Sequence, residues 1–460
     1  MIAENLGKYW HYCRMYGVRS ATLLAIRRLR KPRGSPPITV NPLARLPEQP
    51  TAVPSSLSGK TVSIVIPTKN AGDDLGLLIR KLRNQEGVPQ PEIIVVDSGS
   101  TDNTLEIAAR EKVKVVHIAP EEFTHSYSRN RGAESAGGEY LLFMVQDALP
   151  LTARWLGEMV AALESNNLAA VSCAEYPRSG SDLFYQFLIH DQGERPGLEQ
   201  DRIMAWDTSC NSYLGLRSNA QLSDITALLR RDVFQSYRYR VDYAEDLDLG
   251  IRLIRDGHRL GFLHSTRVLH SHNRPASYFL KRGYVDVRFL VEVFPNFLYP
   301  EIAHAGRLYS DICSLHNRIC ALRQKASALE FPAPLANIFA LSCATLAGRD
   351  ATEPRLASRH DPALDAFLNK LEAGAGASRV VERSMIMPHV MKHFNRFQSW
   401  TSEVYDQADE SLCNEILSAV EKIFALHAGN HLAYLYLTSL KRREMNLSLV
   451  EIDKTLVAGV

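Results

Sequence analysis

Short apolar runs alternate with amphipathic stretches in the first half of the chain. Residues 62–67, 92–97 and 113–118 are apolar runs of strand length. Residues 74–84 and 103–111 lie between them and carry apolar side chains at helical spacing, which predicts two helices. The order strand, helix, strand, helix, strand predicts right-handed crossovers and a parallel sheet with helices on both faces.

A fourth apolar run, residues 140–145, is bounded by Gly137-Gly138 and Pro150 and predicts another strand that is buried on both faces. Asp147 follows this strand, just as Asp97 ends the strand at residues 92–97. Ligands of open α/β sheets bind beyond the carboxyl ends of such strands, so both acids are placed to meet a ligand or a metal. The alternative for Asp147 is a cap for a helix that starts after Pro150.

The pattern changes beyond about residue 300, where apolar positions follow helical spacing with few strand signals. The expected helices cover residues 302–329, 333–346, 362–371, 380–397 and 411–440. We therefore divide the chain into an α/β segment, residues 61–295, and a helical accessory region, residues 296–460. This region shows no catalytic constellation, and its expected role is oligomerisation, acceptor handling or membrane docking.

The N-terminal part differs from both the α/β segment and the helical accessory region. Residues 1–31 form a basic amphipathic segment, which predicts a helix that either lies on an anionic membrane or docks on the folded domain. Residues 32–60 form a linker, because the prolines at 32, 36, 37, 42, 47, 50 and 54 prevent a helix or a central strand.

Composition narrows the class of protein. The chain has 460 residues, of which 45% are hydrophobic, enough for two or three folded units. A net charge of +2 gives no reason to expect nucleic acid as a partner. The 7 cysteines are scattered, as in a reduced cytosolic protein. Without a signal peptide or an 18-residue apolar run, we expect a cytoplasmic protein, with possible contact to the inner face of the cytoplasmic membrane.

A second group of polar residues follows about a hundred residues after Asp147. Glu245 and Asp246 stand where a helix would begin, a place where the helix dipole favours carboxylates. His270 and His272 follow a strand at residues 267–269, and alternation puts both on one face. They are either hydrogen-bonded surface residues or ligands, since imidazole is an ordinary ligand for Mn²⁺-like ions and less so for Mg²⁺.

Four motifs follow one another along the chain: Val62-Ser-Ile-Val-Ile-Pro-Thr-Lys-Asn70, Ile93-Ile-Val-Val-Asp-Ser-Gly-Ser-Thr-Asp102, Arg129-Asn-Arg-Gly132 and Gln146-Asp147-Ala-Leu-Pro150. In this order they resemble the family 2 glycosyltransferases of the inverting GT-A fold. Within that family the chain looks like the rhamnosyltransferase-like members of bacterial surface polysaccharide assembly. The resemblance covers about residues 60–290 and implies a GT-A type, Rossmann-like, mostly parallel sheet with flanking helices.

The resemblance implies a pocket for a nucleoside-diphosphate sugar. Asp97 would accept a hydrogen bond from a pyrimidine imide N–H, and Pro67 and Thr68 would pack on the base. Asp102 and Arg129 would line the pocket, where Arg129 either pairs with the diphosphate or bridges structural carboxylates. The remaining residues of the predicted pocket are Asn70, Gln146 and Asp147.

The resemblance also implies a divalent metal, Mn²⁺ or Mg²⁺, that Asp147 holds against the two phosphates. Val145 stands where the family's D-x-D motif has its first acid, which leaves metal dependence open. A histidine after the later strand replaces that acid, and His270 is the expected ligand, with His272 as the other candidate.

The resemblance further implies that one acid of the Glu245-Asp246 pair is the general base, and Asp246 is the expected one, with Glu245 in reserve. The predicted function is inverting transfer of a sugar from dTDP-rhamnose or a UDP-sugar to a glycan or polyprenyl-linked acceptor. Two alternatives stay open. A sugar-1-phosphate nucleotidyltransferase would need a basic, glycine-rich loop after the first strand, which residues 68–72 do not supply. An inactive nucleotide-sugar-binding scaffold is favoured only by Val145.

Overall fold

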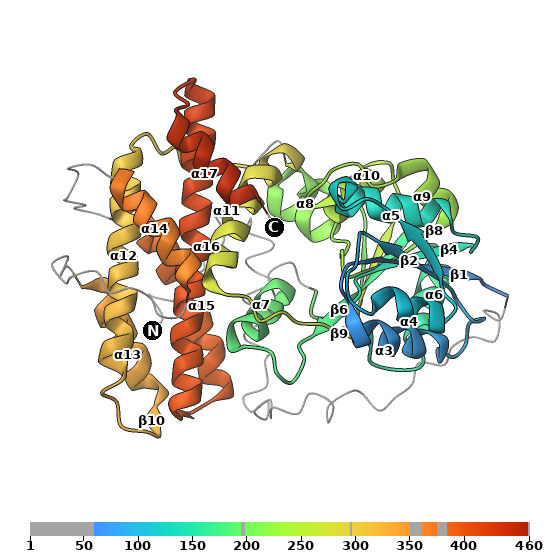
Figure 1. The fold of residues 1–460 in the computed structure, drawn as a ribbon, viewed down its shortest axis with the longest axis horizontal. Coiled ribbons are helices and arrows are strands. Elements are labelled where there is room, and N and C mark those ends of the chain that lie inside the picture. Colours follow the sequence, from blue (N-terminus) through green and yellow to red (C-terminus); the bar gives the residue numbers. More distant parts are fainter. Residues whose placement is uncertain (1–58, 195–197, 295–296, 349–360, 375–383, 459–460) are drawn as a thin grey trace. The chain divides into compact units, whose positions relative to one another are not determined.

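The computed structural model describes residues 59–194, 198–294, 297–348, 361–374 and 384–458 (Figure 1). The predicted basic segment, residues 1–31, and nearly all of the linker lie outside the described residues. Among the described residues, no helix is long and apolar enough to cross a membrane.

A sheet of nine strands forms the centre of the α/β segment in the described part of the chain. Its order is β3 (Lys114–His117), β2 (Glu92–Asp97), β1 (Val62–Thr68), β4 (Tyr140–Met144), β8 (Thr226–Arg230), β6 (Ala170–Tyr176), β9 (Leu260–Leu269) and β5 (Leu149–Pro150), with β7 (Arg202–Met204) paired to β9. The first four strands are parallel, whereas β8 runs antiparallel to both of its neighbours. The predicted α/β fold with a mostly parallel sheet is confirmed.

The register brings the carboxyl ends of the parallel strands to one edge. Thr68 of β1 lies beside Asp97 of β2, and β4 pairs with the other side of β1. Strands β1, β2 and β4 consist largely of buried Val, Ile, Leu and Phe, which suits strands covered on both faces. The polar residues that follow these strands therefore gather at the same edge.

Helices cover both faces of the sheet (Figure 1). Helices α3 (Gly72–Arg83), α4 (Thr104–Arg110) and α6 (Trp155–Ser165) pack on one face. The other face carries α5 (His125–Glu134), α8 (Tyr213–Asn219), α9 (Arg231–Tyr237) and α10 (Glu245–Arg255). Helix α5 lies very close to the strands, because a Cβ atom on Gly132 would sit 2.3 Å from a methyl group of Val65.

The C-terminal part is helical, as predicted. It comprises α11 (Ala276–Val293), α12 (Ala305–Ala326), α13 (Leu335–Ala347), α14 (Pro362–Gly374), α15 (Met387–Val404), α16 (Glu410–Arg442) and α17 (Leu447–Val457), with the short strands β10 (Ala333–Pro334) and β11 (Gln407–Ala408). These helices share one apolar core with α7 (Leu183–Glu194). Two helices inside the predicted α/β segment, α7 and α11, thus contribute to the helical core.

Candidate active site

Asp97 ends strand β2 and organises the loop that follows. Its carboxylate accepts hydrogen bonds from the backbone N–H groups of Gly99 at 3.0 Å and Ser100 at 3.2 Å. The residue is 2% exposed, and Thr68 beside it is equally buried. Pro67 is half-buried at the same end of β1. These predicted base-binding residues therefore meet at the carboxyl edge of the sheet.

Asn70 and Gln146 join neighbouring loops at this edge. Asn70 adopts a left-handed backbone conformation with φ of 50°, and its side-chain oxygen accepts from the backbone N–H of Thr101 at 2.8 Å. Gln146 pairs with both backbone groups of Lys69: its oxygen accepts from the N–H at 2.9 Å, and its amide donates to the carbonyl at 3.2 Å. Both predicted pocket residues thus fix the backbone around the site.

Asp102 has a similar loop-holding role. One carboxylate oxygen accepts from the backbone N–H of Gly72, and the other accepts from the backbone N–H of Thr104, each at 3.0 Å. Hydrogen bonding to the Thr104 side chain is the main reason that the pKa of Asp102 is lowered. Asp102 therefore joins the starts of α3 and α4 as a carboxylate.

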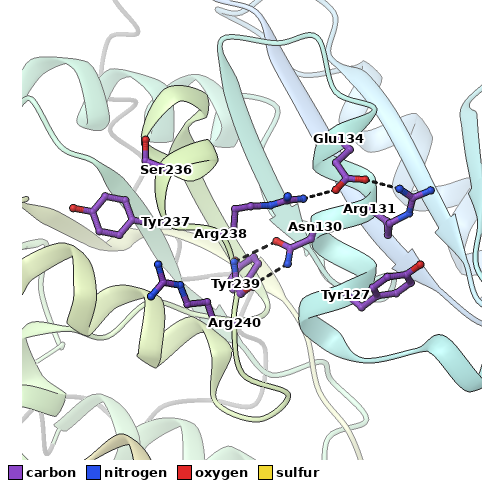
Figure 2. A pocket seen from close by; sticks show the side chains of 9 residues that line it. All are labelled: Tyr127, Asn130, Arg131, Glu134, Ser236, Tyr237, Arg238, Tyr239 and Arg240. Atoms are coloured by element: carbon purple, nitrogen blue, oxygen red, sulfur yellow. Dashed lines mark hydrogen bonds and ion pairs between the residues drawn. The ribbon is translucent and has the colours of Figure 1, made fainter.

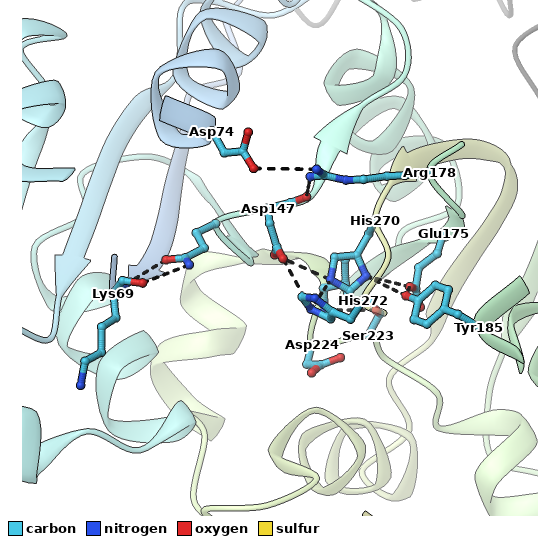
Figure 3. Close-up of polar contacts among 12 residues, drawn as sticks. Lys69, Asp74, Asp147, Glu175, Arg178, Tyr185, Ser223, Asp224, His270 and His272 are labelled. Carbon is cyan, nitrogen blue, oxygen red and sulfur yellow. Dashed lines mark hydrogen bonds and ion pairs between the residues drawn. The ribbon is translucent and has the colours of Figure 1, made fainter. Parts of the chain in front are cut away.

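Asp147, His270 and His272 converge after strands β4 and β9 (Figure 3). The Nε2 atom of His270 lies 3.7 Å from one oxygen of Asp147, and the Nε2 atom of His272 lies 3.4 Å from the other. The two Nε2 atoms are 3.2 Å apart. In the described ranges, these three residues are the one group of acids, histidines or cysteines that offers three ligand atoms within 4.8 Å of one another.

The far side of the His270 ring is fixed by a tyrosine and an acid. Its Nδ1 atom lies 3.0 Å from Glu175 Oε2 and 3.0 Å from the Tyr185 hydroxyl, which itself donates to Glu175 at 2.7 Å. Burial acts to lower the pKa of His270, but Glu175 and Asp147 outweigh it, and the pKa is raised. A partner at Nδ1 leaves Nε2 to act as the ligand atom, so the donor set fits a divalent cation.

Val145 and Arg178 complete this part of the site. Val145, which replaces the first acid of the family motif, packs against the apolar core on one face of the sheet. Arg178 donates a hydrogen bond to the backbone carbonyl of Asp147 at 2.6 Å, and it lies 3.8 Å from Asp74 (Figure 3). A guanidinium group therefore stands beside the candidate ligands.

The sequence left two roles open for Arg129, pairing with a diphosphate or bridging structural groups, and its contacts in the structure are of the bridging kind. It is 1% exposed, and it donates to Glu245 at 2.6 Å and to the backbone carbonyl of Asp224 at 2.9 Å. This ion pair joins α5 to the first residue of α10 beneath the site. With its guanidinium enclosed in this way, Arg129 has no exposed face for a diphosphate in this structure.

Asp246 lies in the first turn of α10 and is half-buried. Burial and the nearby charges of Asp224 and Glu245 raise its pKa to about 8. The helix begins after Ala244, which adopts a left-handed conformation with φ of 54°. A carboxylate whose pKa lies close to neutral is well suited to accept a proton. Since Glu245 is committed to Arg129, Asp246 is the better placed of the two acids.

Sequence reasoning missed Glu175, Arg178, Tyr185 and Asp224. The negative charge of Asp224 raises the pKa of both Asp246 and His270. No motif in residues 175–222 marks the first three, and nothing in the local sequence distinguishes Asp224 from an ordinary surface acid. Their contacts join residues that are far apart in the sequence.

A hollow of about 430 Å³ is lined by residues of α5 and by residues 236–240 (Figure 2). Its lining is Tyr127, Asn130, Arg131, Glu134, Ser236, Tyr237, Arg238, Tyr239 and Arg240, which includes none of the predicted site residues. Arg131 and Arg238 both form ion pairs with Glu134 at 2.5 Å. Because these three side chains pair with one another and no predicted site residue lines the hollow, we do not assign the candidate active site to it.

Comparison with known proteins supports the resemblance. The family model for glycosyl transferase family 2 matches residues 63–237. The O-antigen chain rhamnosyltransferase WbaN of Salmonella anatum is 27% identical over 219 residues, covering 46% of this chain and 66% of WbaN. RfbN of Salmonella typhimurium, also an O-antigen chain rhamnosyltransferase, is 24% identical over 217 residues, covering 46% of this chain and 67% of RfbN. The chain thus spans about two thirds of the length of these relatives.

Solved structures give weaker likenesses. The mannosyltransferase PcManGT from Pyrobaculum calidifontis, in complex with GDP-Man and Mn²⁺, is 15% identical with a TM-score of 0.43, covering 94% of this chain and 95% of that one. Glucosyl-3-phosphoglycerate synthase from Mycobacterium tuberculosis, with Mg²⁺ and UDP, is 17% identical with a TM-score of 0.40, covering 53% and 84%. Neither bears on function at this level of likeness. The family match shows that residues 63–237 of the chain form a glycosyl transferase family 2 domain.

Proposed function

We propose that the chain is an inverting, metal-dependent glycosyltransferase that acts in the assembly of a surface polysaccharide. It moves a sugar from a nucleoside-diphosphate sugar to a hydroxyl of a glycan or polyprenyl-linked glycan. The observation that carries this proposal is the convergence of Asp147, His270 and His272 at the carboxyl edge of a family 2 sheet. Ligands of such sheets bind in the crevice at this edge.

The nucleotide sugar would bind at the carboxyl ends of β1, β2 and β4. Asp147 and the two histidines would hold Mn²⁺ or Mg²⁺, which neutralises charge on the departing diphosphate when bound. Two imidazole ligands favour a Mn²⁺-like ion over Mg²⁺. Arg178 adds a fixed cation beside Asp147. The donor is dTDP-rhamnose or a UDP-sugar, since Asp97 can accept from a pyrimidine imide.

The acceptor hydroxyl would bind near the first turn of α10, where Asp246 lies. The acceptor oxygen attacks the anomeric carbon, its bond to that carbon forms as the bond to the diphosphate breaks, and its proton passes to the Asp246 carboxylate. One displacement of this kind inverts the configuration at the anomeric carbon. General-base assistance of this type contributes about 10²- to 10⁴-fold in rate.

A thermal-shift screen with Mn²⁺ tests the donor proposal, because a ligand that binds the native state raises its apparent stability. We expect UDP or dTDP to raise the melting temperature and GDP to leave it unchanged. Equal shifts with all three nucleotides would contradict the role of Asp97 in selecting the base.

A second candidate is an inactive scaffold that binds a nucleotide sugar. It is favoured by Val145, which removes one carboxylate from the expected metal motif. An assay of sugar transfer to any hydroxyl acceptor, or of slow donor hydrolysis, separates the two candidates. Metal-dependent nucleotide binding without either reaction would support the scaffold.

A further inference from the structure

Helix α7 packs in the helical core, and one of its side chains, Tyr185, reaches the candidate active site. The hydroxyl of Tyr185 donates to Glu175 and lies 3.0 Å from Nδ1 of His270 (Figure 3). Its neighbours Phe184 and Phe187, on the same helix, are each 1% exposed in the core of the C-terminal helices. A single helix therefore contacts both the candidate metal ligand and the helical region.

The start of α7 is attached to helix α16 by two contacts. Asp182 caps α7 by accepting from the backbone N–H of Tyr185 at 2.9 Å, and its other oxygen pairs with Lys422 at 2.8 Å. The Lys422 side chain is only 7% exposed. The backbone N–H of Leu183 donates to Glu415 at 2.8 Å. Both Lys422 and Glu415 belong to α16, so this helix fixes the first turn of α7.

The same turn is also joined to the histidine loop. The backbone N–H of Asp182 donates to the side-chain oxygen of Asn273 at 2.8 Å, and the Asn273 amide donates to the carbonyl of Gly180 at 2.8 Å. Asn273 directly follows His272. A shift of the first turn of α7 would therefore disturb the loop of the candidate ligands as well as the hydroxyl of Tyr185.

We propose that Tyr185 is a positioning residue for His270, and that the C-terminal helices hold it in place through Lys422 and Asp182. This inference rests on the proposed metal site and gives the helical region a definite role in it. The Tyr185 hydroxyl and Glu175 orient the imidazole ring so that Nε2 points toward Asp147. Partners of this kind typically change metal affinity by about 10- to 100-fold when they are lost.

The first experiment measures Mn²⁺ binding to the full chain without nucleotide, by the electron paramagnetic resonance signal of free Mn²⁺. Tyr185→Phe keeps the ring and removes only the hydroxyl, so we expect the Kd for Mn²⁺ to rise about 10- to 100-fold. Metal-free binding of UDP or dTDP should not change. A purely structural role for Tyr185 would lower the melting temperature and leave the Kd for Mn²⁺ as it is.

Asp147→Ala serves as the reference variant in this experiment. If Asp147→Ala binds Mn²⁺ normally, the proposed metal site itself is wrong. If Asp147→Ala abolishes binding while Tyr185→Phe binds like the native chain, only the positioning role of Tyr185 is overturned.

The second experiment tests the route from α16. Lys422→Met leaves Asp182 without its cation, and we expect the Kd for Mn²⁺ to rise on the order of tenfold. Lys441→Met is the matched control, because Lys441 lies on the same helix and pairs with Glu301 but is 66% exposed. The control should bind Mn²⁺ like the native chain.

A double-mutant cycle decides whether Lys422 acts through Tyr185. In the Tyr185→Phe background, Lys422→Met should weaken Mn²⁺ binding little further, because both changes interrupt one route. Independent, additive losses would overturn the proposed route. If Lys422→Met does not fold, Glu415→Ala replaces it in the cycle, since Glu415 is the other anchor of α7 on α16 and alanine cannot accept the hydrogen bond from the Leu183 N–H.

Discussion

Two acids of the candidate site, Glu245 and Asp147, have different kinds of partners for their negative charge. Glu245 has its counter-charge within the chain, since the buried guanidinium of Arg129 lies 2.6 Å away. Asp147 instead faces two imidazoles whose nitrogen atoms are as close to each other as to its carboxylate. The first arrangement is complete in itself and suits a structural role. The second brings three ligand atoms together and suits a divalent cation.

Asp246 belongs to neither arrangement. It lies next to Glu245 in sequence, yet the pKa of its carboxyl group is raised to about 8. Buried ion pairs hold a carboxylate in its charged form, whereas burial beside like charges makes it ready to take up a proton. These differences support the proposed roles: a structural role for Glu245, metal binding for Asp147 and proton transfer for Asp246.

The largest expected effect is at the proposed metal ligands. Asp147→Ala and His270→Ala should each abolish transfer and weaken metal-dependent binding of UDP or dTDP, with folding intact. A titration with Mn²⁺ in which the binding of UDP or dTDP is the signal measures this. His272→Ala in the same titration decides whether the second imidazole belongs to the ligand set, and a normal titration for any variant would remove that side chain from it.

The next effect is at the proposed base. Asp246→Asn should lower turnover by at least about a hundredfold while donor affinity stays nearly unchanged. Steady-state kinetics with donor binding measured separately checks this. A variant that melts early but turns over normally would show that Asp246 only supports helix α10, and Glu245 would then be the acid to test.

The raised pKa of Asp246 also predicts the sign of two pH effects. Because the base must be ionised, turnover should rise as the pH increases through about 8. The pKa in the folded chain exceeds that in the unfolded chain, so ionisation of this carboxyl group opposes folding. The stability of the native chain is therefore reduced progressively as the pH rises from 3.8, the ordinary value for an aspartate, to about 8. Asp246→Asn should melt no earlier than the native chain at pH 7, which calorimetry can measure.

Arg129 tests the structural side of the comparison. Arg129→Met leaves Glu245 as an unpaired buried carboxylate, which typically costs about 3–5 kcal/mol in the free energy of unfolding. Arg131→Met is the matched control on the same helix, because its ion pair with Glu134 is exposed and should contribute about 0–1 kcal/mol. Urea denaturation distinguishes the two, and equal losses would contradict a special role for the buried pair.

The smallest expected effect concerns the N-terminal segment, which lies outside the described residues. Deleting residues 1–31 should release the chain from anionic vesicles while transfer to a soluble acceptor continues. A vesicle co-sedimentation assay measures this, with neutral vesicles as the control. Unchanged binding of the shortened chain would remove the membrane role of this segment.

Local patterns predicted much of the fold. The apolar runs gave strand β2 its observed limits and β1 and β4 limits within one residue, because a strand buried on both faces needs consecutive apolar side chains. The acid that ends β2, Asp97, and the acid that follows β4, Asp147, were predicted from these runs and lie at the carboxyl edge of the sheet. Alternation put His270 and His272 on one face, and the structure brings both Nε2 atoms toward Asp147.

The remaining parts of the site depend on contacts that no local pattern encodes. The role of Arg129 was left open because its partner, Glu245, is 116 residues away. Tyr185 and Glu175 lie in a stretch without motifs, and they reach His270 across 85 and 95 residues. Only the packing of α7 against the helical core brings these side chains to the site.

We propose a single displacement, with Asp147 and the histidines on the leaving-group side and Asp246 on the acceptor side. Nuclear magnetic resonance of the product compares the anomeric configuration of the transferred sugar with that of the donor. We expect the configuration to be inverted. A product with the donor's configuration retained would contradict the single displacement and the role assigned to Asp246.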